Sequence, residues 1–173
     1  NIGPEKFAEN RSAIKAILAA ASMRGGEGDD RRRRAELRSR AAFALGVIGG
    51  DEALARLARL LDDAEVNVRY NAAIGLARHG DVRAIPVLVE MLDPDNDAAV
   101  ASEITDDLRN HKQTMVNVNA AKAAQALAER WPKNGEPSKL AELSKALDEL
   151  ARSESTPAVR NAAKEAMHQI DGL

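Results

Sequence analysis

The sequence predicts an all-α fold, an α-solenoid in which seven or eight helices stack in pairs. Segments 37–62 and 68–93 align without a gap at an offset of 31 residues and share nine identities. Alanine occurs 34 times, whereas only four residues are aromatic. This composition favours closely packed helices, because alanine is the best helix former and lets helix axes approach. A helix pair that cannot bury its apolar face alone stacks on its neighbours and so forms a solenoid.

The first expected element is an N-terminal helix over residues 4–23. Apolar side chains recur in it at helical spacing, at Phe7, Ile14, Ile17 and Leu18. We expect this helix either to cap the stack or to belong to a preceding unit that this chain contains only in part.

Two helix pairs are expected next, over residues 34–62 and 65–93. The first helix of each pair ends at a glycine, Gly49 or Gly80, and glycine is the usual residue just past a helix C-terminus. In the second pair, Pro86 lies near the start of the second helix, where its missing N–H is tolerated.

The joint after these pairs is longer than the joint between them. Six residues separate Asp62 from Val68, whereas 25 separate the equivalent Asp93 from Val118, so about 19 residues (25 − 6) are extra. We therefore expect an insertion over 94–114, and insertions in solenoids lie on one face and often carry function.

The array is expected to end with a third pair over 115–152 and a C-terminal helix over 156–171. The C-terminal helix repeats the first-helix pattern, with Val159 and Arg160 at the positions of Val68 and Arg69.

The pattern V-R-x-x-A-A-x-x-L-x-x-x-G-D-x-R-A-I-P-x-L over 68–88 resembles the HEAT repeat. It is most similar to the short bacterial variety known as the phycobilisome-lyase HEAT-like repeat. The preceding repeat departs from the pattern at two positions, with Leu37 for the valine and Ala55 for the proline. The resemblance implies stacked helix pairs that bind a protein or peptide on a concave surface.

The resemblance also implies a structural role for one arginine position, which Arg38, Arg69 and Arg160 share. In HEAT proteins an arginine there usually joins a ladder with an aspartate of a neighbouring joint. Asp63 stands where that aspartate falls.

The outward side of the second helices is the expected partner surface. If Leu54, Leu57 and Leu61 point inward, the side chains one position away point outward. The resulting candidate residues for partner binding are Arg56, Arg59, Arg83, Val87 and Glu90. The alternative is an ordinary solvated helix face.

Charge is unevenly distributed although the chain as a whole carries only −2. Arg31, Arg32, Arg33 and Arg34 open the first helix of the 34–62 pair, and residues 24–40 contain seven arginines against four acids, a net charge of +3. Cations at a helix N-terminus oppose the macrodipole. The run is therefore either a solvated turn neutralised by the aspartates before it or a contact for an anion or an acidic protein.

The acidic insertion raises the question of a metal site. Residues 93–104 begin with Asp93, Asp95 and Asp97, the alternate spacing of a calcium loop, but the loop lacks glycine at its sixth position and an acid at its twelfth. We expect a turn followed by a helix that Asp95 or Asp97 caps. Residues 84–110 hold seven acids and one base, a net charge of −6 that suits a basic partner.

No pattern in the chain points to catalysis, a cofactor or a metal. His79, His111 and His168 are scattered and none precedes a glutamate, unlike the iron-binding His-Glu pairs of deoxyhypusine hydroxylase, another protein built of these repeats. Segment 25–30 lacks the Lys-Ser/Thr ending of a phosphate-binding loop. The chain has no cysteine, no apolar run of about 18 residues for a membrane span, and no basic face with stacking aromatic residues for nucleic acid.

These observations favour a non-catalytic protein–protein interaction module. Two alternatives stay open: an accessory subunit of a bilin-lyase-like enzyme, and a structural spacer within a larger multidomain protein. The sequence does not distinguish a cytoplasmic from an exported chain, and it leaves the partner and the oligomeric state undetermined.

Overall fold

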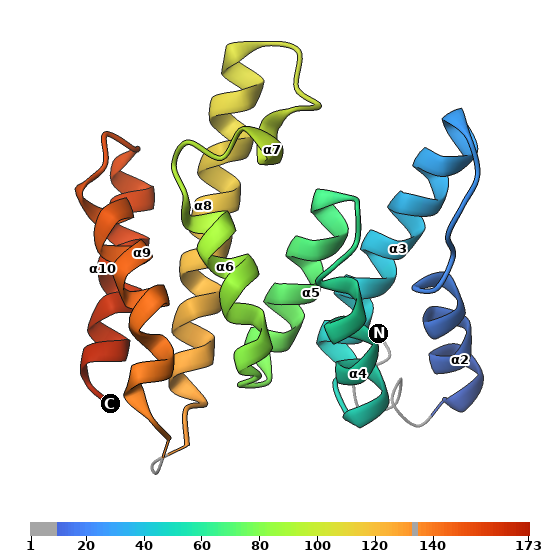
Figure 1. Ribbon diagram of the computed structural model, residues 1–173, viewed down its shortest axis with the longest axis horizontal. Helices are drawn as coiled ribbons and strands as arrows, with labels where there is room; N and C mark the ends of the chain where they lie inside the picture. Colours follow the sequence, from blue (N-terminus) through green and yellow to red (C-terminus); the bar gives the residue numbers. More distant parts are fainter. Residues whose placement is uncertain (1–9, 133–134) are drawn as a thin grey trace. The chain divides into compact units, whose positions relative to one another are not determined.

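The computed structural model describes residues 10–132 and 135–173 (Figure 1). The predicted all-α class is confirmed, since these residues form α-helices and short 3₁₀ turns and contain no strand. The chain divides into two compact units, Asn1–Leu76 and Ala77–Leu173. Among the described residues there are nine α-helices, one of which is a single turn in the insertion.

The first unit contains α2 (Arg11–Ala20), α3 (Gly28–Ile48) and α4 (Asp51–Leu60), and α5 (Val66–Arg78) begins in it. Helix α3 packs against both α2 and α4. The helix expected over 4–23 is described only from its N-cap onwards, and residues 4–9, with Phe7, lie outside the described residues.

The ends of these helices follow from capping chemistry. The Asn10 side chain accepts a hydrogen bond from the Ala13 N–H at 3.1 Å and so caps α2. Helix α3 ends at Gly49, which has a φ of 70°, and α5 is followed by Gly80 with a φ of 76°. Both glycines adopt a left-handed conformation that a side chain would disfavour, so the two predicted helix ends are confirmed.

Helix α3 begins at Gly28, six residues before the predicted start at residue 34. Its first turn carries Asp29 and Asp30, whose negative charge is favourable near the positive end of the helix dipole. The arginine run at 31–34 therefore lies inside the helix and does not open it.

Helices α3 and α5 approach so closely that their backbones touch. A Cβ atom added to Gly46 would lie 2.6 Å from the Cα of Gly75, and one added to Gly75 would lie 2.9 Å from the Cα of Gly46. Both glycines are buried in the last turn of their helices. Glycine weakens a helix, so its presence at both positions reflects the need for this close approach.

The second unit forms two layers of helices. One layer is made by α8 and α10, the other by α6 and α9, and α6 also contacts α8 (Figure 1). Its elements are η1 (Val82–Ala84), α6 (Ile85–Leu92), α7 (Asp97–Val100), α8 (Asp106–Glu129), η2 (Pro137–Leu140), α9 (Ala141–Arg152) and α10 (Pro157–Asp171). Its core consists largely of alanine and leucine.

The insertion at 94–114 is mostly helical. Helix α7 lies against the N-terminal half of α8 (Figure 1). With 24 residues, α8 is longer than the neighbouring first helices α5, with 13, and α10, with 15. The cap of α7 is Asn96, whose side chain accepts a hydrogen bond from the Ala99 N–H at 3.2 Å. The expectation that Asp95 or Asp97 provides this cap is wrong.

The repeat register predicted for α8 is also wrong by two residues. Val116, Ala120 and Ala121 are buried like Val68, Ala72 and Ala73 of α5, so Val116 takes the place assigned to Val118. The segment from Asp93 to Val116 spans 23 residues, which leaves about 17 inserted residues (23 − 6). Asn117 consequently occupies the arginine position of the repeat.

The glycine contact predicts that a methyl group at residue 46 destabilises the protein. We expect Gly46→Ala to lower the free energy of unfolding by about 1–3 kcal/mol, as overpacking does, although alanine stabilises an isolated helix by about 1 kcal/mol relative to glycine. Chemical denaturation measures the change. Gly172→Ala is the matched control, because a Cβ there meets its nearest atom at an ordinary 3.5 Å. Equal or greater stability of Gly46→Ala would contradict the close approach.

Candidate functional site

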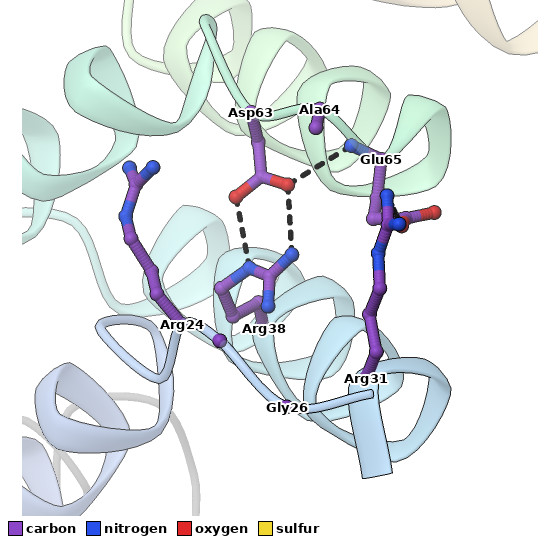
Figure 2. A pocket seen from close by; sticks show the side chains of 8 residues that line it. Arg24, Gly26, Arg31, Arg38, Asp63, Ala64 and Glu65 are labelled. Atoms are coloured by element: carbon purple, nitrogen blue, oxygen red, sulfur yellow. Dashed lines mark hydrogen bonds and ion pairs between the residues drawn. The ribbon is translucent and has the colours of Figure 1, made fainter. Parts of the chain in front are cut away.

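A buried ion pair joins α3 to the joint between α4 and α5. The Nε of Arg38 donates to one carboxylate oxygen of Asp63 at 2.8 Å, and Nη2 donates to the other at 2.9 Å (Figure 2). Both residues are nearly inaccessible, at 7% and 2% of their surface. Arg38 also donates through Nη1 to the Met23 carbonyl at 2.8 Å. The pair therefore ties three segments of the first unit together.

The Asp63 carboxylate is held in its charged form. Burial raises its pKa, but the hydrogen bond from Arg38, the Glu65 backbone N–H at 3.0 Å and the charges of Arg38 and Arg24 together outweigh burial, so the pKa lies below its ordinary value. Because the acceptor atoms of this carboxylate are occupied by these donors, Asp63 is a structural residue.

The other residues at the arginine position all bind backbone carbonyls of the joint before their helix. Arg69 donates to the Asp63 carbonyl at 3.0 Å, and Arg160 donates to the Ser155 carbonyl. Asn117 donates to the Met91 carbonyl at 2.8 Å, at the end of α6. Met91 belongs to the last turn of α6, whose carbonyls lack partners within the helix, whereas Asp63 and Ser155 lie in the joints just beyond α4 and α9. The shared function of this repeat position is thus to satisfy backbone carbonyls at or just beyond the end of the preceding second helix.

The four consecutive arginines have different environments. Arg34 donates to the Asp30 carboxylate at 2.9 Å and to the Arg24 carbonyl at 3.0 Å. Arg31 lies 3.5 Å from the Glu65 carboxylate. Arg32 and Arg33 are exposed, and Arg32 comes only within 4.0 Å of Asp29. Of the run, one arginine is structural, one faces the joint and two face solvent.

A pocket of about 270 Å³ opens beside the Arg38–Asp63 pair. Figure 2 shows Arg24 and Arg31 extending on either side of this pair, with the glycine loop 25–26 below them. Ala64 and Glu65 complete the wall. We refer to this feature as the arginine pocket.

In the first unit, the predicted partner-binding residues of α4 differ in exposure. Arg59 is exposed in the last turn of the helix. Arg56 is half-buried, and its Nε lies buried without a hydrogen-bond partner among the described residues. Arg59 is therefore available to a partner, whereas Arg56 is largely packed against the protein.

In the second unit, the predicted outward orientation of Val87 is wrong, because the residue is 7% exposed. Helix α6 contacts both α8 and α9, which widens its buried face to include this position. Arg83 is fixed by Asp81, to which its Nε donates at 2.9 Å. This hydrogen bond, which outweighs the effect of burial, lowers the pKa of Asp81 and raises that of Arg83. Glu90 is half-buried.

The second helices of the second unit share a hollow of about 270 Å³ between α6 and α9. Its lining combines apolar groups with three carboxylates and contains no basic residue. The lining residues are Val89, Glu90, Leu92, Asp93, Pro94, Ala146 and Glu149. We refer to this feature as the α6–α9 hollow.

The insertion is anchored by polar contacts and exposes several apolar side chains. Lys112 donates to Glu103 at 3.0 Å, and this bond together with that from Ser102 lowers the pKa of the Glu103 carboxyl. Ile104 is 90% exposed, and Leu108 and Met115 are about half exposed. In the part of the chain that the structure describes, no group of three or more His, Asp or Glu side chains is placed to hold a metal ion.

Comparison with known families agrees with the observed helix pairs. Residues 30–109 match the family model for HEAT repeats. This segment of the chain is therefore similar to HEAT repeats. Neither the curated proteins nor the solved structures gave a match. HEAT repeats commonly act as protein-interaction scaffolds and are typically non-enzymatic. No helix among the described residues has the length and apolar character needed to cross a membrane.

Several residues of these sites are absent from the sequence-based prediction, among them Arg24, Glu65, Asn117 and Glu149. Arg24 and Glu65 line the arginine pocket from flanking joints, and no sequence spacing places them beside α3. Asn117 could have been found, because V-N-V-N-A-A at 116–121 matches V-R-Y-N-A-A at 68–73 in four of six positions. Arg31, Arg34 and Arg38 also follow the i, i+3, i+7 spacing of one helix face, which indicates a shared contact.

Breaking the buried ion pair is predicted to be strongly destabilising. Asp63→Asn leaves the Arg38 charge buried without a counterion, so the free energy of unfolding is expected to fall by about 3–5 kcal/mol. Glu36→Gln, which removes an exposed ion pair with Arg40, is the control and should change it by at most about 0.5 kcal/mol. Similar effects of the two changes in urea denaturation would refute the structural importance of the pair.

The lowered pKa of Asp63 predicts an acid-dependent loss of stability. A depressed folded-state pKa stabilises the fold above the unfolded-state pKa of about 3.9, and this contribution disappears as the pH falls through the folded-state value. The difference in unfolding free energy between the wild type and Asp63→Asn should therefore be largest near neutral pH and shrink below about pH 4. Denaturation curves measured across this range test it, and a difference independent of pH would contradict the assignment.

Proposed function

We propose that this protein is a non-catalytic interaction module that holds a segment of a partner protein on the outward face of its second helices. The observation that carries the proposal is the α6–α9 hollow, which the second helices of two neighbouring helix pairs form together. HEAT repeats with their scaffold role provide the context, because stacked repeats present extended surfaces for binding.

The lining of the hollow indicates the chemistry of the bound segment. Val89 and Ala146 offer apolar surface, while Glu90, Asp93 and Glu149 place three carboxylates around it. A segment with an apolar side chain flanked by lysine or arginine fits this combination, because burial of the apolar group supplies affinity and the charges supply specificity. The strong negative charge of residues 84–110, −6, also favours approach of a basic partner.

Capture from a cell extract with the full chain as bait tests this function. Glu149→Lys reverses one charge at the hollow, and Glu165→Lys makes the same change on the exposed surface of α10. We expect quantitative mass spectrometry to show proteins that the wild type and Glu165→Lys retain and that Glu149→Lys loses by about tenfold, the effect of reversing a close charge contact. Capture that is unaffected by Glu149→Lys, or no specific capture at all, would exclude the second-helix face as the binding surface.

A further inference from the structure

We propose that the arginine pocket is a second binding site, which recognises a single carboxylate of an acidic segment in a partner protein. The proposal concerns the first unit and uses none of the residues of the α6–α9 hollow. It rests on the proposed function only in that the ligand belongs to a protein partner.

The structure fixes the backbone that carries Arg24 while leaving its side chain uncommitted. Arg38 and Arg34, on successive turns of α3, donate to the carbonyls of Met23 and Arg24 at 2.8 and 3.0 Å. The Arg24 guanidinium itself has no hydrogen bond or ion pair within the described part of the chain, although its charge acts on Asp63. The fixed backbone therefore keeps the Arg24 side chain at the pocket, and its guanidinium is available to bind an anion.

Arg31 provides a second cation on the opposite side of the pocket (Figure 2). Its contact with Glu65, at 3.5 Å, is exposed on both sides, with 65% and 37% of the side chains accessible. Such an ion pair is weak in water, so it leaves the Arg31 guanidinium able to turn toward an incoming anion. Between the two cations, Arg38 and Asp63 neutralise each other.

The charge balance of the pocket favours a carboxylate over a phosphate. Three arginines and two carboxylates line it, a net charge of +1. One carboxylate neutralises this charge, whereas a phosphate dianion would leave excess negative charge beside Asp63 and Glu65. Arginine also binds the planar carboxylate with two parallel hydrogen bonds. An acidic side chain or the free C-terminus of a partner supplies this group.

The pocket mouth stays open because glycine forms one of its edges. Gly25 and Gly26 have φ values of 81° and 85°, which side chains disfavour. At Gly26 an added Cβ would also come within 2.5 Å of the Asp30 carboxylate. This loop thereby passes close to the first turns of α3 and leaves the space between the two arginines uncovered.

Peptide titration followed by nuclear magnetic resonance tests the proposal with the full chain at low salt. The probes are a capped peptide with one Asp-Glu pair, a peptide whose only carboxylate is its C-terminus, a neutral capped peptide and inorganic phosphate. We expect a carboxylate peptide to shift the signals of Arg24, Arg31 and Gly26 saturably, and the neutral peptide to leave them unchanged. Comparison of the first two probes shows whether the pocket binds the carboxylate of an acidic side chain or that of a free C-terminus.

Matched charge variants separate the pocket from general electrostatic attraction. Arg24→Gln and Arg31→Gln should each weaken binding about tenfold, the loss of one charge-assisted hydrogen bond. Arg32→Gln and Arg33→Gln remove the same charge at exposed residues outside the pocket and should weaken it less than about threefold, since exposed charges are screened.

Three results would overturn the proposal: no binding of either acidic peptide, equal weakening by Arg31→Gln and Arg33→Gln, or tighter binding of phosphate than of the peptides. Because these measurements involve only the first unit's pocket, they can fail while capture through the α6–α9 hollow succeeds. The reverse outcome would leave the arginine pocket as the binding site of the protein.

Discussion

The repeats of this protein depend on one requirement: backbone carbonyl groups at or just beyond the end of the preceding helix need donors from the first helix of the next pair. A repeat position occupied by arginine or asparagine meets this requirement in each joint where it is described. Arg38 also binds Asp63. The buried positive charge of its guanidinium is thereby neutralised by a carboxylate that is buried with it. The local geometry of the first unit, including the loop that carries Arg24, follows from this network.

The requirement explains why the joints differ although the helix pairs repeat. The position equivalent to Asp63 in the next repeat is Pro94, which cannot pair with an arginine. Asn117 replaces the arginine in α8 and binds carbonyl groups alone, so no buried charge needs a partner there. Where the aspartate is missing, the arginine is thus replaced by the neutral donor Asn117. The additional residues of the insertion fold as α7 and as extra turns of α8.

The two units carry opposite surface chemistry. The first unit exposes arginines around a pocket whose net charge is +1, while the second surrounds an apolar hollow with carboxylates. Only the packed face of each helix is constrained by the repeat. The exposed face can therefore carry different charges in the two units. The proposed carboxylate site and the proposed site for a basic segment thus use chemically distinct surfaces, and the same partner need not occupy both.

The helix pairs, their glycine ends and the all-α class follow from the amino-acid sequence alone, because they depend on periodicity and on local backbone preferences that act within a few residues. The spacing of Val68, Ala72 and Leu76 is sufficient to identify a buried helix face. The excess of acidic residues in the insertion was equally visible in the sequence.

Which residues are available to a partner depends instead on the folded arrangement of the helices and loops. Val87 is buried because α6 packs on two helices at once, Arg34 is occupied by a carbonyl from a loop, and Arg24 reaches the pocket from another joint. Each of these outcomes depends on segments that are distant in sequence and meet only in the folded chain. A one-dimensional pattern assigns a residue to a helix face, but neighbouring helices and loops determine whether that face is covered.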